Sequence, residues 1–171
     1  MLEELKKYNA KATFFCIGKN VAKHPQIVKK IETNGHSIGN HTQNHVNCWK
    51  VSKKTYLNDV EEAKKNINLK TNMFNSIADN LFRPPYGKIT SKRAKQLQKK
   101  GYKVIMWDVL SADFDQRISP EKCLENVVEN ATKGSIVVFH DSVKAHKNLA
   151  YALPKILAYY SKKGFQFKSL Y

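Results

Sequence analysis

The chain has 171 residues, of which 42% are hydrophobic and 26% charged, values typical of one globular domain spanning residues 1–171. No apolar run approaches the roughly 18 residues that a membrane-spanning helix needs, so we expect no membrane span. The N-terminus has no signal-peptide pattern. We therefore expect either a cytoplasmic protein or a chain whose true start is missing, in which case the cell envelope or secretion is the alternative.

The net charge of +16 comes mainly from lysine, because only Arg83, Arg93 and Arg117 are arginines. Arginine is the preferred reader of phosphates and guanines, so its scarcity argues against specific nucleic-acid binding. Lysines scattered along helix faces indicate a solvated surface, with attraction to an anionic polymer as a secondary reading. A basic domain that associates with nucleic acid is kept as an alternative hypothesis of a different functional class.

Short apolar runs alternate with helical patterns along the whole chain. Helices are expected over residues 2–9, 25–31, 52–69, 90–100, from 119 onward, and 146–163, and strands over 12–17, 36–39, 77–82, 102–107, 135–139 and 165–170. This alternation predicts an α/β fold of parallel strands joined by crossover helices, either a barrel or an open sheet.

The polar residues that follow the strands decide between these two architectures. His41, Arg83, Asp113 and His140 each come soon after the end of an apolar run. Contributions from several strand ends are typical of a barrel, whereas an open sheet concentrates its ligand at one switch point, often with a glycine-rich loop. The sequence has no such loop, which favours a (β/α) barrel.

His41 and His45 are spaced so that both imidazoles can reach one ion if the segment is helical or tightly turned. Imidazole binds zinc, cobalt and nickel, so we predict a divalent metal here, with zinc first and cobalt or nickel as alternatives. Cys48 follows closely, and a thiolate ligand is the less favoured alternative to a structural cysteine.

Two further segments carry candidate catalytic residues. In residues 83–87 (RPPYG), two prolines stiffen a loop suited to hold a backbone N–H toward a developing oxyanion, and Arg83 can orient a carboxylate. Asp113 can orient a histidine, Phe114 can form a stacking wall for a sugar, and His140 is a candidate general acid or base.

In this order, the segments KATFFCIG (11–18), GHSIGNHTQNH (35–45), RPPYG (83–87), WDVLSADF (107–114) and IVVFHD (136–141) resemble the polysaccharide deacetylase family, carbohydrate esterase family four. The resemblance covers nearly the whole chain. It implies a distorted (β/α) barrel that removes N- or O-acetyl groups from glycans such as chitin oligomers or peptidoglycan, so an acetylated glycan is the expected partner.

The resemblance also implies a role for each matching residue. His41 and His45 correspond to metal ligands, Arg83 to the residue that positions the catalytic carboxylate, and Tyr86 to the backbone donor to the oxyanion. The remaining roles go to His140 as general acid, Asp113 as its tuning partner, and Pro85, Phe114 and Val138 as substrate-binding residues.

One departure from the family pattern is large. The family begins with a strand ending in a Thr-Phe-Asp-Asp type motif, whose acids supply the base and the third metal ligand, and this chain begins in the helix after it. We therefore expect a deacetylase that is truncated at its first strand and turns over chito-oligosaccharides poorly or not at all. The alternative is a non-catalytic relative that binds glycans through the same groove. The oligomeric state is left open.

Overall fold

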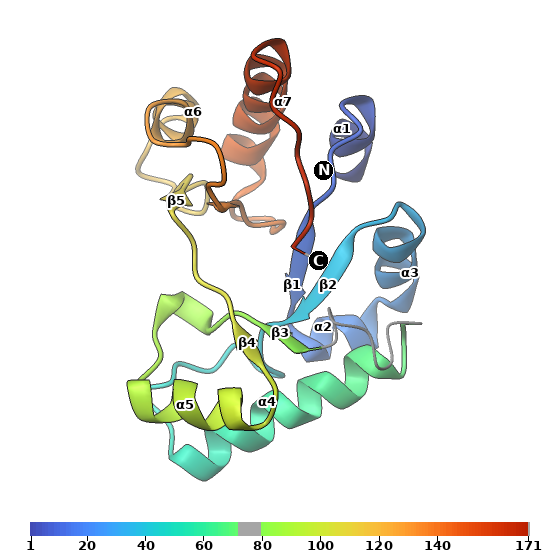
Figure 1. Ribbon diagram of the computed structural model, residues 1–171, viewed down its shortest axis with the longest axis vertical. Coiled ribbons are helices and arrows are strands. Elements are labelled where there is room, and N and C mark those ends of the chain that lie inside the picture. The colour runs from blue at the N-terminus through green and yellow to red at the C-terminus, as the bar shows by residue number, and fades with distance from the viewer. Residues whose placement is uncertain (72–79, 171) are drawn as a thin grey trace. The chain divides into compact units, whose positions relative to one another are not determined.

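The computed structural model describes residues 1–71 and 80–170, which form two compact units (Figure 1). The larger unit contains Lys11–Met106 and Ser169–Tyr171, and the smaller contains Met1–Ala10 and Trp107–Lys168. Among the described residues, no helix is both long and apolar enough to cross a membrane. The assignment of residues 1–171 to one domain stays a prediction.

The larger unit is built on a parallel sheet in the order β1-β2-β3-β4. Its strands are β1 (Thr13–Cys16), β2 (Ser37–Asn40), β3 (Leu81–Phe82) and β4 (Lys103–Val104), and its helices are α2 (Gly18–Lys23), α3 (Pro25–Thr33), α4 (Lys53–Asn68) and α5 (Ser91–Lys99), with a 3₁₀ turn η2 (Pro85–Gly87). Parallel neighbours joined through helices are the connection that the alternating sequence pattern predicts, and this prediction is confirmed.

Local sequence explains where the helices of this unit begin. Pro25 occupies the first turn of α3, where its missing N–H is not needed. The Ser52 hydroxyl accepts a hydrogen bond from the Thr55 amide at the start of α4, and Thr90 does the same for Arg93 at the start of α5. A core cluster of this unit gathers side chains of α4, β3, α5 and the adjoining loops: Cys48, Tyr56, Val60, Phe82, Leu97 and Tyr102.

The smaller unit pairs two short parallel strands, β5 (Val109–Leu110) and β6 (Val137–Val138). Its helices are α1 (Leu2–Lys7), α6 (Pro120–Val128) and α7 (His146–Lys162). Ser119 caps α6 through the Lys122 amide, as the Ser-Pro-Glu sequence predicts. The apolar faces of α6 and α7 pack together around Val109, Cys123, Val127, Ala152, Ile156 and Tyr160.

Two expected strands differ from the structure. Residues 165–170 form no strand, because the Phe165 and Phe167 rings pack against the core of the smaller unit without a ladder partner. The strand expected over 102–107 is confined to β4, and the separate β5 follows it. In the strand expected over 77–82, residues 77–79 lie outside the described part of the chain, and the described part is β3.

Candidate active site

His41 is the first residue after β2, and its backbone and ring are both fixed. Its amide donates to the Cys16 carbonyl, which extends the pairing of β1 with β2. Its Nδ1 lies 2.6 Å from the Arg83 carbonyl oxygen. Because a carbonyl oxygen can only accept, Nδ1 carries the proton and the ring lone pair is on Nε2. This is the second contact that metal-binding histidines use to fix ring orientation.

The geometry of His41 and His45 fits two ligands of one tetrahedral ion. An imidazole nitrogen about 2.1 Å from zinc places the ring centre roughly 3.2 Å from the ion, so two such rings have centres about 5 Å apart. The His41 and His45 ring centroids lie 5.0 Å apart with an interplanar angle of 59°. The separation is compatible with two ligands of one ion, and the metal-ligand roles of His41 and His45 stay predictions.

Backbone strain is concentrated in this segment and in the adjacent RPPYG loop. Thr42, His45 and Tyr86 have φ values of 65°, 56° and 60°, in the left-handed region that non-glycine residues rarely adopt. Each such conformation costs about 1–3 kcal/mol, and it persists only when surrounding contacts enforce it. The His45 and Tyr86 rings lie 4.6 Å apart, so two of these strained residues touch.

Asp59, which was not predicted as a site residue, holds the histidine segment in place from α4. Its buried carboxylate accepts hydrogen bonds from the Gln43 amide (2.8 Å), the Asn44 amide (3.0 Å) and the Asn44 side chain (2.7 Å). The sequence carries a signal for it, because Asp59 lies on the same face of α4 as the buried Tyr56, Val60 and Ala63. An acid within an apolar helix face indicates a buried partner.

The RPPYG loop follows β3 directly. Arg83 donates from Nε to the Ile105 carbonyl (3.3 Å) and from Nη2 to the Met106 carbonyl (3.0 Å), and its guanidinium lies 4.2 Å from the centre of the Phe15 ring. Burial lowers the pKa of Arg83 to about 10, so it is still cationic at neutral pH. Its role toward a carboxylate stays a prediction.

Tyr86 is more than half exposed, while Pro84 and Pro85 are fully buried. The turn around Tyr86 is closed by hydrogen bonds from Gly87 to the Pro84 carbonyl and from Lys88 to the Pro85 carbonyl. The prolines therefore anchor a rigid turn that presents Tyr86, which is the property that the sequence predicted for this loop. The substrate contact predicted for Pro85 stays a prediction.

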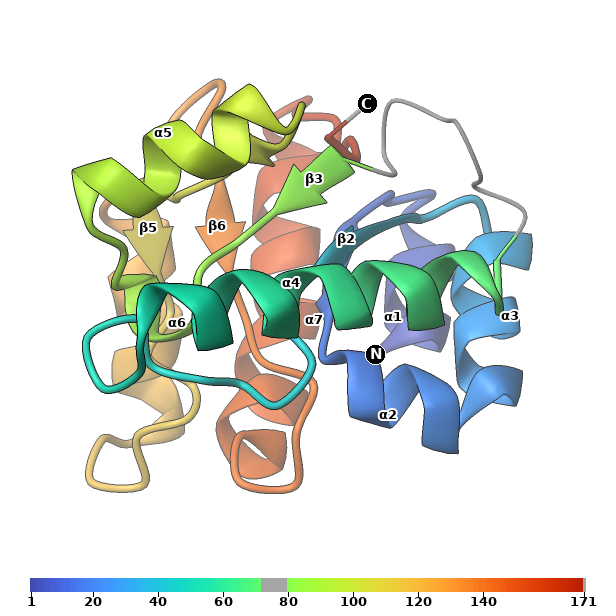
Figure 2. The same ribbon diagram turned by 90° about the horizontal axis from the view of Figure 1, so that it is seen from below.

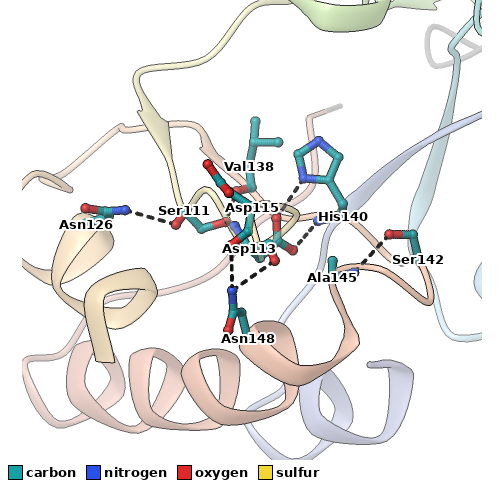
Figure 3. A network of polar contacts seen from close by, with 9 residues as sticks. All are labelled: Ser111, Asp113, Asp115, Asn126, Val138, His140, Ser142, Ala145 and Asn148. Carbon is teal, nitrogen blue, oxygen red and sulfur yellow. Dashed lines mark hydrogen bonds and ion pairs between the residues drawn. The ribbon is translucent and has the colours of Figure 1, made fainter. Parts of the chain in front are cut away.

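In the smaller unit, the buried Asp113 pairs with the partly exposed His140 (Figure 3). One Asp113 carboxylate oxygen accepts from His140 Nδ1 at 2.8 Å, and the other accepts from the His140 backbone amide at 2.6 Å. Asp113 is completely buried, whereas the His140 side chain is 40% exposed. The carboxylate thus fixes the Nδ1–H tautomer and leaves Nε2 to exchange protons, an arrangement suited to a general acid or base.

Buried polar side chains support this pair, and none of them was predicted (Figure 3). The Ser111 hydroxyl accepts from the Asp113 amide and donates to the Val138 carbonyl. The Asn148 side-chain amide, on α7, lies within hydrogen-bonding distance of the Asp113 and Asp115 carbonyls. Asn148 is a polar residue on a buried helix face, the same sequence signal that marks Asp59.

Two predicted substrate-binding residues lie beside the pair. The Phe114 ring contacts the His140 ring edge-on at a centroid distance of 4.9 Å, and Val138 is buried on β6. Phe114 therefore limits the directions from which a ligand can approach His140. The substrate roles of both residues stay predictions.

In the described part of the chain, the histidine segment brings together two side chains of a type that can bind a metal, His41 and His45. Among the described residues, no group of three or more histidine, cysteine, aspartate or glutamate side chains could hold a metal ion. Cys48 is fully buried in the core of the larger unit, where Arg93 donates to its sulfur at 3.1 Å, so the alternative of a thiolate ligand is not supported. His41 and His45 fit two of the positions around an ion.

Comparison with known proteins identifies relatives along the whole chain. The family described as polysaccharide deacetylase matches residues 1–105. A peptidoglycan-N-acetylglucosamine deacetylase of Bacillus cereus is 34% identical over 171 residues, covering 99% of this chain and 60% of that protein. A second Bacillus cereus protein of the same description is 35% identical, covering 98% of this chain and 76% of the relative. The chain thus spans 60% of the first relative's length.

Solved structures agree with these relatives. A peptidoglycan N-acetylglucosamine deacetylase in complex with 4-naphthalen-1-yl-N-oxidanyl-benzamide superimposes with a TM-score of 0.90 at 33% identity, covering 99% of this chain and 77% of that one. A carbohydrate esterase family 4 pseudoenzyme from Bacillus anthracis superimposes with a TM-score of 0.86 at 26% identity, covering 99% and 57%. The predicted fold class, an α/β fold of the distorted (β/α) barrel type, is confirmed by these matches. The family match over residues 1–105, and the 35% identity to a relative of which this chain covers 76%, show that the chain belongs to the polysaccharide deacetylase family.

Proposed function

We propose that the protein removes acetyl groups from an N-acetylated glycan of the peptidoglycan or chitin-oligomer type, in a reaction that depends on a divalent metal. Family membership supports hydrolytic deacetylation, and the relatives' descriptions supply the substrate class. The observation that carries metal dependence is the His41–His45 pair, with ring centroids 5.0 Å apart and the His41 tautomer fixed by the Arg83 carbonyl.

His41 and His45 would hold the metal, with zinc as the first candidate and cobalt or nickel as alternatives. A bound divalent ion supplies Lewis-acid polarisation of the acetyl carbonyl and activation of water. We assign neither the third ligand nor the base to a described residue.

Each remaining step is assigned to one of this chain's groups. The Tyr86 backbone amide would donate to the oxyanion from a turn that the buried prolines make rigid. Arg83 would position the catalytic carboxylate. His140, oriented through Nδ1 by Asp113, would protonate the departing amine from Nε2. Pro85, Phe114 and Val138 would contact the substrate.

The first experiment measures metal binding by titration calorimetry and acetate release from chitopentaose and from peptidoglycan. It uses the 171-residue chain with added zinc, cobalt or nickel and with a chelator. We expect His41→Ala and His45→Ala each to weaken metal binding at least about tenfold, and His140→Ala to leave it unchanged. Equal metal binding by the wild-type chain and by the double variant His41→Ala with His45→Ala would overturn the metal assignment.

The same assay tests catalysis. Acetate release that the chelator abolishes and His140→Ala strongly reduces would support the proposed reaction. Turnover of chito-oligosaccharides that is poor or absent stays a prediction for this chain, and the assay measures it directly. Release that is unaffected by both the chelator and His140→Ala would contradict the proposed mechanism.

A non-catalytic glycan-binding protein is the second candidate. The specific observation in its favour is the likeness to the Bacillus anthracis pseudoenzyme, for which a mutant with restored enzymatic activity has also been solved. Glycan binding without acetate release under every metal condition would favour this second function over the first.

A further inference from the structure

A pocket in the larger unit lies along the two loops that carry the histidine site. The loop after β2 bears His45 and continues to Trp49, and the loop after β3 bears Tyr86 and continues to Lys88. The loops touch twice, because the His45 ring contacts the Tyr86 ring and the Lys88 ammonium lies 5.0 Å from the centre of the Trp49 ring. Four residues of chain span at most about 14 Å, which limits the distance from His45 to Trp49.

The pocket has a volume of about 480 Å³ and is lined by Cys48, Trp49, Lys53, Thr90, Lys92 and Arg93. We call it the Trp49 pocket. α4 and α5 begin on the same side of this unit (Figures 1 and 2). All of these lining residues belong to the larger unit, and Cys48 and Trp49 lie in the loop after β2 that also carries the predicted metal ligands.

The charge of the Trp49 pocket is uniformly positive. Lys53 and Lys92 are exposed in the first turns of α4 and α5, where acidic residues are usual and lysine opposes the helix dipole. Neither lysine forms an ion pair within the described part of the chain, and the described residues lining the pocket include no carboxylate. Arg93 differs, because it is held by Cys48 and by the Val51 carbonyl.

Trp49 is the apolar element of the Trp49 pocket. Its side chain is 65% exposed, although tryptophan is usually largely covered by the fold. Its backbone amide donates to the Asn47 side chain, and the Lys88 ammonium lies over its ring. An exposed indole beside ammonium groups offers a flat apolar face to a sugar ring and cations to an acidic substituent.

We propose that the Trp49 pocket is a distal subsite that binds a carboxylate-bearing sugar of the glycan chain, with the pyranose ring on Trp49 and the carboxylate between Lys53 and Lys92. This inference rests on the proposed deacetylase function and adds the preference for an acidic glycan. The charge complementarity favours an acidic sugar over a neutral one, and the shared loops place the subsite within reach of a short oligosaccharide bound at His45.

The test compares a neutral probe, chitopentaose, with a peptide-free peptidoglycan oligosaccharide of the same length whose muramic acid residues carry free lactyl carboxylates. The chain has two tryptophans, so a Trp107→Phe background makes Trp49 fluorescence report on the pocket alone. Calorimetry on the wild-type background provides the same affinities independently. The key variant is Lys53→Glu with Lys92→Glu, and the charge-matched control is Lys95→Glu with Lys99→Glu, one to two turns further along α5.

We expect the acidic probe to bind more tightly than the neutral one and to change Trp49 fluorescence. The pocket variant should bind the acidic probe about tenfold more weakly, and the control should change its affinity less than about twofold. Trp49→Ala should weaken the binding of both probes. The subsite would be overturned if the pocket variant and the control lost equal affinity for the acidic probe. It would also be overturned if the acidic probe saturated the protein without a change in Trp49 fluorescence.

Failure of the subsite and failure of the proposed function give different results. If metal-dependent acetate release from chitopentaose is retained while the pocket variant binds the acidic probe normally, the subsite is wrong and the function stands. If no acetate is released from either probe under any metal condition, the non-catalytic glycan-binding function is favoured over deacetylation, while Trp49 fluorescence still decides whether the acidic sugar binds in the pocket.

Discussion

Replacing Asp59 by alanine tests whether α4 holds the histidine segment in its strained conformation. The substitution removes a buried carboxylate that accepts three hydrogen bonds, two from Asn44 and one from the Gln43 amide. The Gln43 amide retains an acceptor, because the Asp59 backbone carbonyl lies 3.0 Å away, and Asn44 is exposed enough for water to reach its donors.

The magnitude follows from these contacts. A hydrogen bond to a charged group contributes about 1.5–3 kcal/mol, and two such bonds are lost without an alternative protein acceptor. With partial compensation by water at Asn44, we expect Asp59→Ala to lower the free energy of unfolding by about 2–4 kcal/mol. His45 follows Asn44 directly, so a released segment should also weaken zinc binding about tenfold, as loss of outer hydrogen bonds does at other metal sites.

Urea denaturation and calorimetric titration with zinc measure the two effects. Asp59→Asn, which keeps one acceptor oxygen, should lie between wild type and Asp59→Ala in both, and it provides the test if the alanine variant does not fold. Glu62→Ala on the exposed face of α4 is the matched control. Stability and zinc affinity indistinguishable from those of Glu62→Ala would refute the reasoning.

Three further changes test packing and ionisation elsewhere. Gly18→Ala should lower the free energy of unfolding by about 1–3 kcal/mol in urea, because a Cβ there would lie 2.7 Å from the Ala63 Cα. Tyr160→Phe should lower it by about 1–2 kcal/mol in the same assay, since the hydroxyl lies 2.9 Å from the Ala131 carbonyl oxygen in a buried position. Burial raises the pKa of the Cys123 thiol from 9.0 to about 11, so unfolding releases a proton between these values. Its contribution to stability should be complete below pH 9 and decline toward pH 11, and Cys123→Ala should flatten that part of the stability–pH curve.

Local features of the fold could be read from the sequence. The helix starts expected at residues 52 and 119 depend on neighbours within one or two helical turns, and the structure confirms both starts, with Ser52 and Ser119 as caps. The position of a strand is also indicated by a few neighbouring residues, but its length depends on the distant segment with which it pairs. Residues 165–170 have a strand-like pattern without a strand, because pairing needs a partner that the pattern does not specify.

The candidate site also has features that the sequence indicates and features that depend on tertiary contacts. The spacing of His41 and His45 and the stiffness of the RPPYG segment are properties of short stretches of chain, and their residue types already indicate the chemistry. The sequence could name Asp113 and His140 as candidates for one pair. The two hydrogen bonds between them join residues 27 positions apart and depend on how β5 pairs with β6.

Tertiary structure alone decided which buried polar groups support these residues. Asp59 and Asn148 lie on helix faces that pack inward, and only the packing places an amide or a carbonyl opposite each of them. The same applies to His41, whose tautomer is set by the carbonyl of Arg83 on the neighbouring strand end. Composition, caps and periodicity act over a few residues and therefore determine the elements and the candidate ligands. The partner of a buried polar group is set by which distant segments come into contact, and the cost of leaving that group unpaired makes the choice specific once the chain has folded.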